Sequence, residues 1–98
     1  MMSENYSIEN GKLVYKFSGR MDTTRCMDAE KSVVAALDGV TEVVFDLNGV
    51  DYIASSFLRL CGKASHKVKP GCFSIINAAP PVKKVFKIAG LAERLNLV

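Results

Sequence analysis

The sequence predicts one α/β domain with a mixed, mostly parallel sheet of four or five strands flanked by helices. Strand-like and helix-like patterns alternate along the chain, and this alternation favours parallel strands joined by helices. The chain has 98 residues, enough for one hydrophobic core but not for two. We therefore treat residues 1–98 as a single domain.

The first element is a predicted β-hairpin over residues 6–17. Its two halves are rich in β-forming residues, and Asn10-Gly11 between them is a strong turn dipeptide. Because a hairpin pairs its strands antiparallel, it makes the predicted sheet mixed. Gly19 is expected to end the second strand.

A helix is expected over residues 24–37. The segment Asp22-Thr23-Thr24 supplies N-cap candidates, and apolar side chains then recur at helical spacing. Met27 and Val34 widen that apolar stripe. Gly39 follows as a stop signal.

The middle of the chain predicts a buried strand, a loop and a second helix. Residues 43–47 form a nearly continuous apolar run, which fits a central strand. Residues 48–51 are loop-like. Apolar residues then recur at helical spacing from Phe57 to Val68, and Ser55 or Ser56 is expected to cap this helix.

The last third predicts one further strand and one further helix. Residues 72–76 read as a strand after the Pro70-Gly71 turn. Pro80-Pro81 suits a first helical turn, and an apolar stripe continues to Ala89. Residues 95–98 could add an edge strand.

Charge is unevenly distributed along the chain. Residues 1–49 hold five basic and eight acidic side chains, a net charge of −3, whereas residues 50–98 hold eight and two, a net charge of +6. The overall charge of +3 is too small to predict nucleic-acid binding. The cluster Lys83, Lys84 and Lys87 is either a solvated helix face or a face that attracts an acidic partner.

No apolar run approaches the roughly 18 residues that a membrane span needs, and the N-terminus has no secretory signal pattern. We therefore expect a cytoplasmic protein that does not insert into membranes. The cysteines Cys26, Cys61 and Cys72 are far apart and lack a C-x-x-C pair, which argues against disulfides and zinc and favours small core residues.

No pattern in the sequence indicates catalysis, a metal or a cofactor. His66 is the single histidine, at the expected end of a helix, and no acidic residue near it in sequence would orient it as a base. Phosphate-binding and zinc-protease motifs are absent. We therefore expect a binding protein rather than an enzyme.

The candidate site is the segment around Ser55 and Ser56, where two hydroxyls fall at the start of a helix. A phosphate there would meet unpaired backbone N–H groups and the positive end of the helix dipole, although serine is also common as a plain N-cap. Arg59 could reach the same helical face as Ser56. Phe57 is either a core residue or an exposed anchor for a partner.

At these residues the chain resembles the STAS family of sulfate transporters and anti-sigma-factor antagonists. The resemblance covers about residues 6–98. It is carried by four segments in family order, Gly19-Arg20-Met21-Asp22, Val43–Leu47, Val50–Ile53 with Ser55-Ser56, and Asn77–Phe86 with Ala89-Gly90-Leu91.

The resemblance implies a STAS-like fold and a regulatory binding module. In antagonists of this type, the partner is an anti-sigma factor with serine kinase activity, and phosphorylation ends the binding. By position, Ser56 matches the phosphorylated serine, Ser55 its neighbour, and Asp22 an acidic residue near it. We thus expect Asp22, Ser55, Ser56, Phe57 and Arg59 to bind the partner, with Ser56 phosphorylated.

Two positions depart from the family pattern. The aspartate before the serine pair is Ala54 here, and the glycine after the pair is Phe57. These departures favour an alternative, a constitutive STAS subunit of a transporter ATPase or signalling complex in which Ser56 only caps its helix. An enzyme or small-ligand sensor is a third alternative. The sequence does not predict the oligomeric state.

Overall fold

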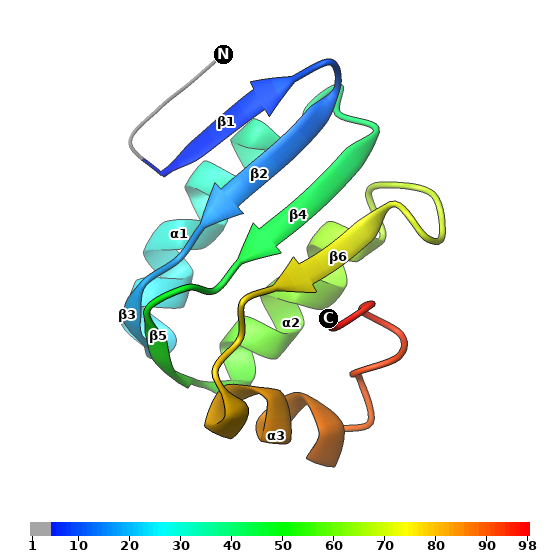
Figure 1. The fold of residues 1–98 in the computed structure, drawn as a ribbon. Coiled ribbons are helices and arrows are strands. Elements are labelled where there is room, and N and C mark those ends of the chain that lie inside the picture. Colours follow the sequence, from blue (N-terminus) through cyan, green and yellow to red (C-terminus); the bar gives the residue numbers. More distant parts are fainter. Residues whose placement is uncertain (1–4) are drawn as a thin grey trace.

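Strands and helices alternate along the chain, as the sequence predicts. The computed structural model describes residues 5–98, and Figure 1 shows their arrangement. The elements in chain order are β1 (Tyr6–Glu9), β2 (Lys12–Lys16), β3 (Gly19–Met21), α1 (Thr23–Ala36), β4 (Glu42–Asp46), β5 (Val50–Ile53), α2 (Ser55–Ser65), β6 (Phe73–Ile76) and α3 (Pro80–Ile88).

The main sheet has four strands in the order β1-β2-β4-β6. β1 runs antiparallel to β2, while β2, β4 and β6 run parallel to one another. The prediction of a mixed, mostly parallel sheet is therefore confirmed. The expected edge strand at residues 95–98 is reduced to one bridge between Leu97 and Ile75.

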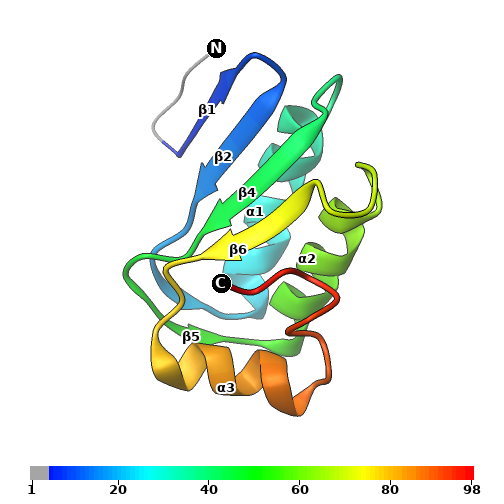
Figure 2. The same cartoon turned by 45° about the vertical axis from the view of Figure 1, so that its right-hand side comes forward.

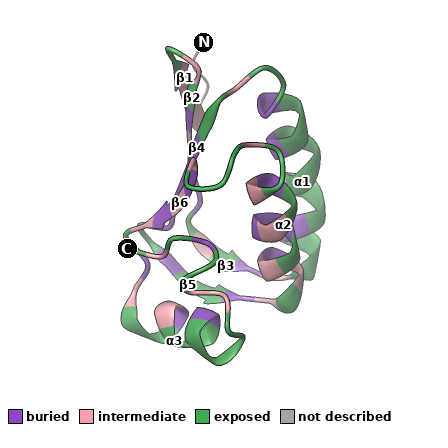
Figure 3. Cartoon of the chain, turned by 90° about the vertical axis from the view of Figure 1, so that its right-hand side faces the viewer, coloured by how far each residue is buried: buried purple, intermediate pink, exposed green. Residues whose placement is uncertain are grey.

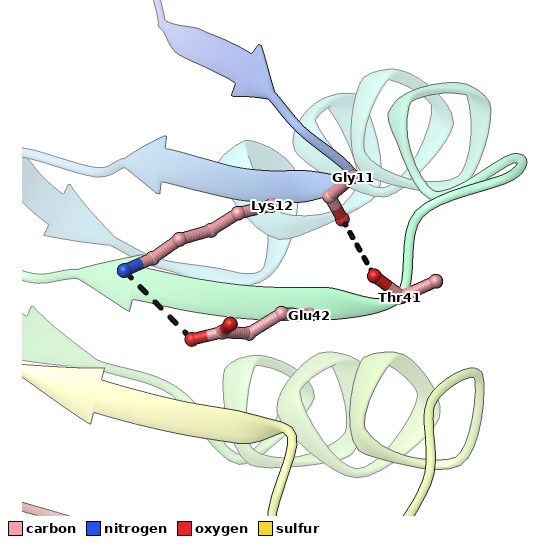
Figure 4. A network of polar contacts seen from close by, with 4 residues as sticks. All are labelled: Gly11, Lys12, Thr41 and Glu42. Carbon is pink, nitrogen blue, oxygen red and sulfur yellow. Dashed lines mark hydrogen bonds and ion pairs between the residues drawn. The ribbon is translucent and has the colours of Figure 1, made fainter.

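The hairpin turn is fastened to the start of β4. Gly11 has φ +80°, and its carbonyl accepts a hydrogen bond from the Thr41 hydroxyl at 3.4 Å. Beside it, Lys12 and Glu42 form an ion pair with 3.7 Å between nitrogen and oxygen, as Figure 4 shows. A Cβ at Gly11 would lie only 2.9 Å from the Thr41 hydroxyl oxygen, so glycine is required both for its backbone conformation and for this close approach.

A second, two-stranded sheet pairs β3 with β5 in parallel. The expectation that Gly19 ends a strand was wrong, because Gly19 begins β3. The expected loop over residues 48–51 is confirmed for Asn48 and Gly49, which form a turn, but Val50 and Asp51 belong to β5. Gly19 turns the chain at φ +75°, and its N–H donates to the carbonyl of Gly49 at 2.8 Å. Strands of three and four residues are too short to show alternation in the sequence.

Helices α1 and α2 lie side by side on one face of the main sheet, and α3 lies at the end of the molecule next to β5 (Figures 2 and 3). The sheet and both helices contribute to one hydrophobic core, for example Phe45 on β4, Val33 on α1 and Leu60 on α2. Two residues of the predicted α1 stripe, Met27 and Val34, face outward and are exposed. Cys26 and Cys61 are buried free cysteines and Cys72 is half-buried, which confirms the first two as core residues.

Candidate functional site

The pairing of β3 with β5 brings the starts of α1 and α2 together. Met21, the last residue of β3, stands opposite Ile53, the last residue of β5. The N–H of Ala54 then donates to the Met21 carbonyl at 3.0 Å. Because each strand leads at once into its helix, the predicted site residues Asp22, Ser55 and Ser56 belong to one junction between the two helix starts (Figure 1).

At the start of α1, Asp22 is the N-cap. Its carboxylate accepts a hydrogen bond from the backbone N–H of Arg25 at 2.9 Å, which satisfies one of the free donors of the first turn. The Arg25 guanidinium in turn donates to the carbonyls of Ser18 at 3.1 Å and Arg20 at 3.4 Å. The half-buried Asp22 thus has a structural role that does not depend on a partner.

At the start of α2 there is no side-chain cap. The N-cap is Ala54, in the extended conformation with φ −88° and ψ 165°. The expectation that Ser55 or Ser56 caps the helix was wrong, because they lie one and two positions after the N-cap, inside the first turn. Because an alanine side chain cannot accept a hydrogen bond, no N-cap side chain accepts from the backbone N–H groups of this turn.

The two serines differ in their surroundings. Ser55 is exposed, whereas Ser56 is half-buried. The Ser56 Oγ is enclosed and has no hydrogen-bond partner within residues 5–98. A buried hydroxyl without a partner costs free energy, so the resting position of Ser56 is a locally unfavourable one.

Cys26, in the first turn of α1, is the neighbour that faces this hydroxyl. Its thiol donates to the Met21 carbonyl at 3.6 Å, so its proton is directed away from Ser56. Burial raises the pKa of Cys26, and the adjacent Ser56 hydroxyl partly offsets that rise because it could donate to a thiolate. The sequence predicted Cys26 only as a core residue, and nothing in its spacing indicated contact with Ser56.

Phe57 is not an exposed anchor, and the expectation that it binds a partner is corrected by its burial. Its side chain has no solvent exposure. The ring packs edge-on against Phe17, with centroids 5.1 Å apart, and lies 6.4 Å from Phe45. The helix turns Phe57 inward while it leaves Ser55 outward, so Phe57 anchors α2 to the sheet and leaves the junction surface to its neighbours.

Two further arginines, Arg59 and Arg20, lie on elements that form the junction. Arg59 is exposed on α2, and no hydrogen bond in the described residues joins it to the Ser56 hydroxyl. Arg20 on β3 lies over the ring of Tyr52 on β5, 4.0 Å from its centroid. Tyr52 is 40 % exposed. The sequence analysis missed this cation–π pair because it depends on the β3–β5 pairing.

Within residues 5–98 there is no group of three histidine, cysteine, aspartate or glutamate residues that could hold a metal ion. Over the same residues, no helix is both long enough and apolar enough to cross a bilayer. The elements of the junction carry the Ser55 and Ser56 hydroxyls, arginine side chains and the Tyr52 ring, which are groups that suit contact with a protein or a phosphate.

Comparison with known proteins agrees with this architecture. The family model described as STAS domain matches residues 3–98. No curated protein matches the chain.

Several solved structures have the same fold at low sequence identity. An anti-sigma-factor antagonist (STAS) domain protein from Planctomyces limnophilus has a TM-score of 0.85 at 22 % identity, over 96 % of this chain and 86 % of that one. An anti-sigma factor antagonist from Mycobacterium paratuberculosis has a TM-score of 0.83 at 21 % identity, over 94 % and 80 %. The anti-sigma factor antagonist SpoIIAA in its unphosphorylated form has a TM-score of 0.76 at 19 % identity, over 95 % and 85 %.

Proposed function

Since the chain belongs to the STAS domain family, we propose that it is a regulatory binding protein of the anti-sigma-factor-antagonist type. In this proposal it binds an anti-sigma factor with serine kinase activity in the cytoplasm, and phosphorylation of Ser56 releases it. The observation that carries the proposal is the position of Ser56 in the uncapped first turn of α2, beside the start of α1.

This position suits a phosphate in two respects. A phosphoserine brings nearly two negative charges and three strong acceptor oxygens. The first turn of α2 offers backbone N–H groups without a side-chain acceptor and the positive end of the helix dipole. The absence of a carboxylate at Ala54 also removes a like charge that would repel the phosphate.

Transfer of a phosphoryl group requires the Ser56 hydroxyl to leave its enclosed position. A change of χ1 between staggered rotamers is a small motion. It breaks no hydrogen bond within residues 5–98, because the Oγ has no partner there, and outside the enclosure the hydroxyl gains contact with water. The enclosed position of the hydroxyl is therefore compatible with Ser56 being phosphorylated by a kinase.

Release of the partner would follow from the added charge. A phosphate placed in a close protein interface must lose its hydration, and it repels acidic groups on the other side. The proposed role needs no catalysis by this chain, whose one histidine, His66, lies at the C-cap of α2, the opposite end of the helix from Ser56.

The enclosure of Ser56 favours a second candidate, a constitutive binding subunit of a transporter ATPase or signalling complex. In that role the hydroxyl would face Cys26 permanently, and Ser56 would only complete the packing between α1 and α2. The two candidates differ in what a negative charge at position 56 does to binding.

The test begins with capture of the partner from the native host on a tagged bait, and with mass spectrometry of both proteins. Binding of the purified pair is then measured by calorimetry for the wild type, Ser56→Asp and Ser55→Asp, with circular dichroism to verify folding. We expect a serine kinase as partner, phosphate on Ser56, and an affinity at least about ten-fold lower for Ser56→Asp than for Ser55→Asp.

A transporter ATPase as partner, with unmodified Ser56 and equal affinities for all three proteins, would replace the switch with the constitutive role. Phosphate found on Ser55 alone would contradict the proposal, because Ser55 and not Ser56 would then be the phosphorylated serine.

A further inference from the structure

A hollow lies at the end of the molecule where α2 finishes. It has a volume of about 360 Å³ and is walled by the α2 C-terminus, the turn that follows it and the C-terminal segment. We call it the basic hollow. It is defined by three basic residues and three apolar ones, His66, Lys69, Arg94, Val68, Pro70 and Phe73.

The basic hollow has no counter-ion within residues 5–98. None of its lining residues is acidic. The ion pairs of the described residues are Lys12 with Glu42 and Lys63 with Glu30, so neither Lys69 nor Arg94 is paired with a carboxylate there. Positive charge is therefore concentrated around a concave surface rather than neutralised.

The C-terminus of α2 accounts for only part of this charge. A helix end carries about half a negative charge and attracts cations within its last turn. Two full cationic side chains, Lys69 and Arg94, exceed that value. The excess remains available to an external anion.

The contact between His66 and Arg94 indicates where such an anion would sit. The Arg94 Nη2 lies 3.4 Å from the His66 Nε2. A guanidinium can only donate, so Arg94 is the donor in this contact, and the contact holds the Arg94 side chain at the rim of the hollow. A tetrahedral oxyanion beside this pair would accept from the remaining Arg94 N–H groups, and a bidentate fork on phosphate is the geometry that arginine favours.

Part of the remaining lining is apolar. Val68 is half-buried and Pro70 is exposed, and a small organic body attached to the anion would cover that surface. The segment that carries Arg94 is fixed to β6, since the Ile75 N–H donates to the Asn96 carbonyl at 3.3 Å and the Val98 N–H donates to the Ile75 carbonyl at 3.0 Å. The position of Arg94 is thereby tied to the sheet.

We propose that the basic hollow is a binding site for a small organic phosphate, held by Arg94 and Lys69 at its phosphate and by Val68 and Pro70 at its apolar part, with His66 positioning the Arg94 side chain. The site is independent of the proposed function, because it lies at the opposite end of α2 from Ser56. It assigns this chain a ligand of a different class from its protein partner.

The test is an amide NMR titration with phenyl phosphate and with inorganic phosphate, at constant ionic strength set by sodium chloride. We expect amide shifts around His66, Lys69 and Arg94, and a dissociation constant for phenyl phosphate in the millimolar range or below. Inorganic phosphate should bind at least about three-fold more weakly, because it does not contact the apolar lining.

Two variants and a matched control separate the site from general charge attraction. Arg94→Ala and Lys69→Ala should each raise the dissociation constant about ten-fold or more. Lys84→Ala removes the same charge from the exposed face of α3 and should change nothing. An absence of shifts up to about 10 mM ligand, or an equal loss in Lys84→Ala, would overturn the site, and equal affinity for the two phosphates would overturn the assignment of an organic ligand.

Discussion

The N–H of Ala54 donates to the carbonyl of Met21 at 3.0 Å, and this bond joins the ends of two strands from which two helices start. It places the N-cap of α2 next to the end of β3. The candidate site is therefore a product of strand pairing as much as of the serine pair, and the residue that occupies position 54 governs the stability of α2 at its first turn.

A cap can be restored at this position. Ala54→Asp should stabilise the protein by about 1 kcal/mol, because the new carboxylate accepts from an amide of the first turn and lies at the positive end of the helix dipole. The measurement is the free energy of unfolding in urea. Ala54→Asn, which can cap without a charge, should give a similar gain, whereas a gain limited to aspartate would assign the effect to charge alone.

The Ser56 hydroxyl is expected to contribute nothing to stability in its enclosed position. Ser56→Ala removes a buried oxygen that lacks a partner, so the free energy of unfolding should stay the same or rise by up to about 1 kcal/mol. Ser55→Ala is the matched control and should change it little, because Ser55 is exposed and is not the cap. A loss of about 1 kcal/mol or more in Ser56→Ala would show that the hydroxyl is bonded in solution.

The hairpin turn offers a separate test of close approach. Gly11→Ala and Gly39→Ala both place a side chain at positive φ, at +80° and +78°, which costs about 1–2 kcal/mol. Only Gly11 also meets the Thr41 hydroxyl, at 2.9 Å from an ideal Cβ, whereas Gly39 has open space around it. Chemical denaturation should therefore show a larger loss for Gly11→Ala, and equal losses would contradict the packing of this turn.

The buried thiols predict that the free energy of unfolding depends on pH under alkaline conditions. Burial raises the pKa of Cys61 well above its ordinary value, with a smaller contribution from Cys26 nearby. A raised folded-state pKa contributes stability that is fully present below the unfolded-state pKa and is lost as pH rises above it. The free energy of unfolding should thus fall from about pH 8.5 upward.

Substitutions identify the thiol responsible. Cys61→Ala should reduce the alkaline slope of unfolding free energy against pH, whatever its effect on stability at pH 7. Cys72→Ala is the control and should keep the wild-type slope, because this side chain is only half-buried. An unchanged slope in Cys61→Ala would mean that the buried thiol does not cause the loss.

The sequence by itself determined the larger elements and their order. The hairpin around Asn10-Gly11, the three helices and the strands β4 and β6 were all predicted within a few residues of their bounds. These predictions succeeded because each element carries a local signal, a turn dipeptide or an apolar period, that the fold does not override. The STAS resemblance, which depended on ordered motifs, was confirmed by the match over residues 3–98.

Tertiary structure decided what the side chains of the site face. Four features of the site have no local signal in the sequence. They are the pairing of β3 with β5, the role of Ala54 as N-cap, the burial of Phe57 and the contact of Ser56 with Cys26. They depend on residues at least 30 positions apart coming together, or on the rotation of α2 about its axis. A helical period identifies which residues share a face, but it does not say which face is buried. In the first turn of α2 the rings of Phe17 and Phe45 pack against Phe57. This packing places Phe57 in the core and leaves Ser55 in solvent.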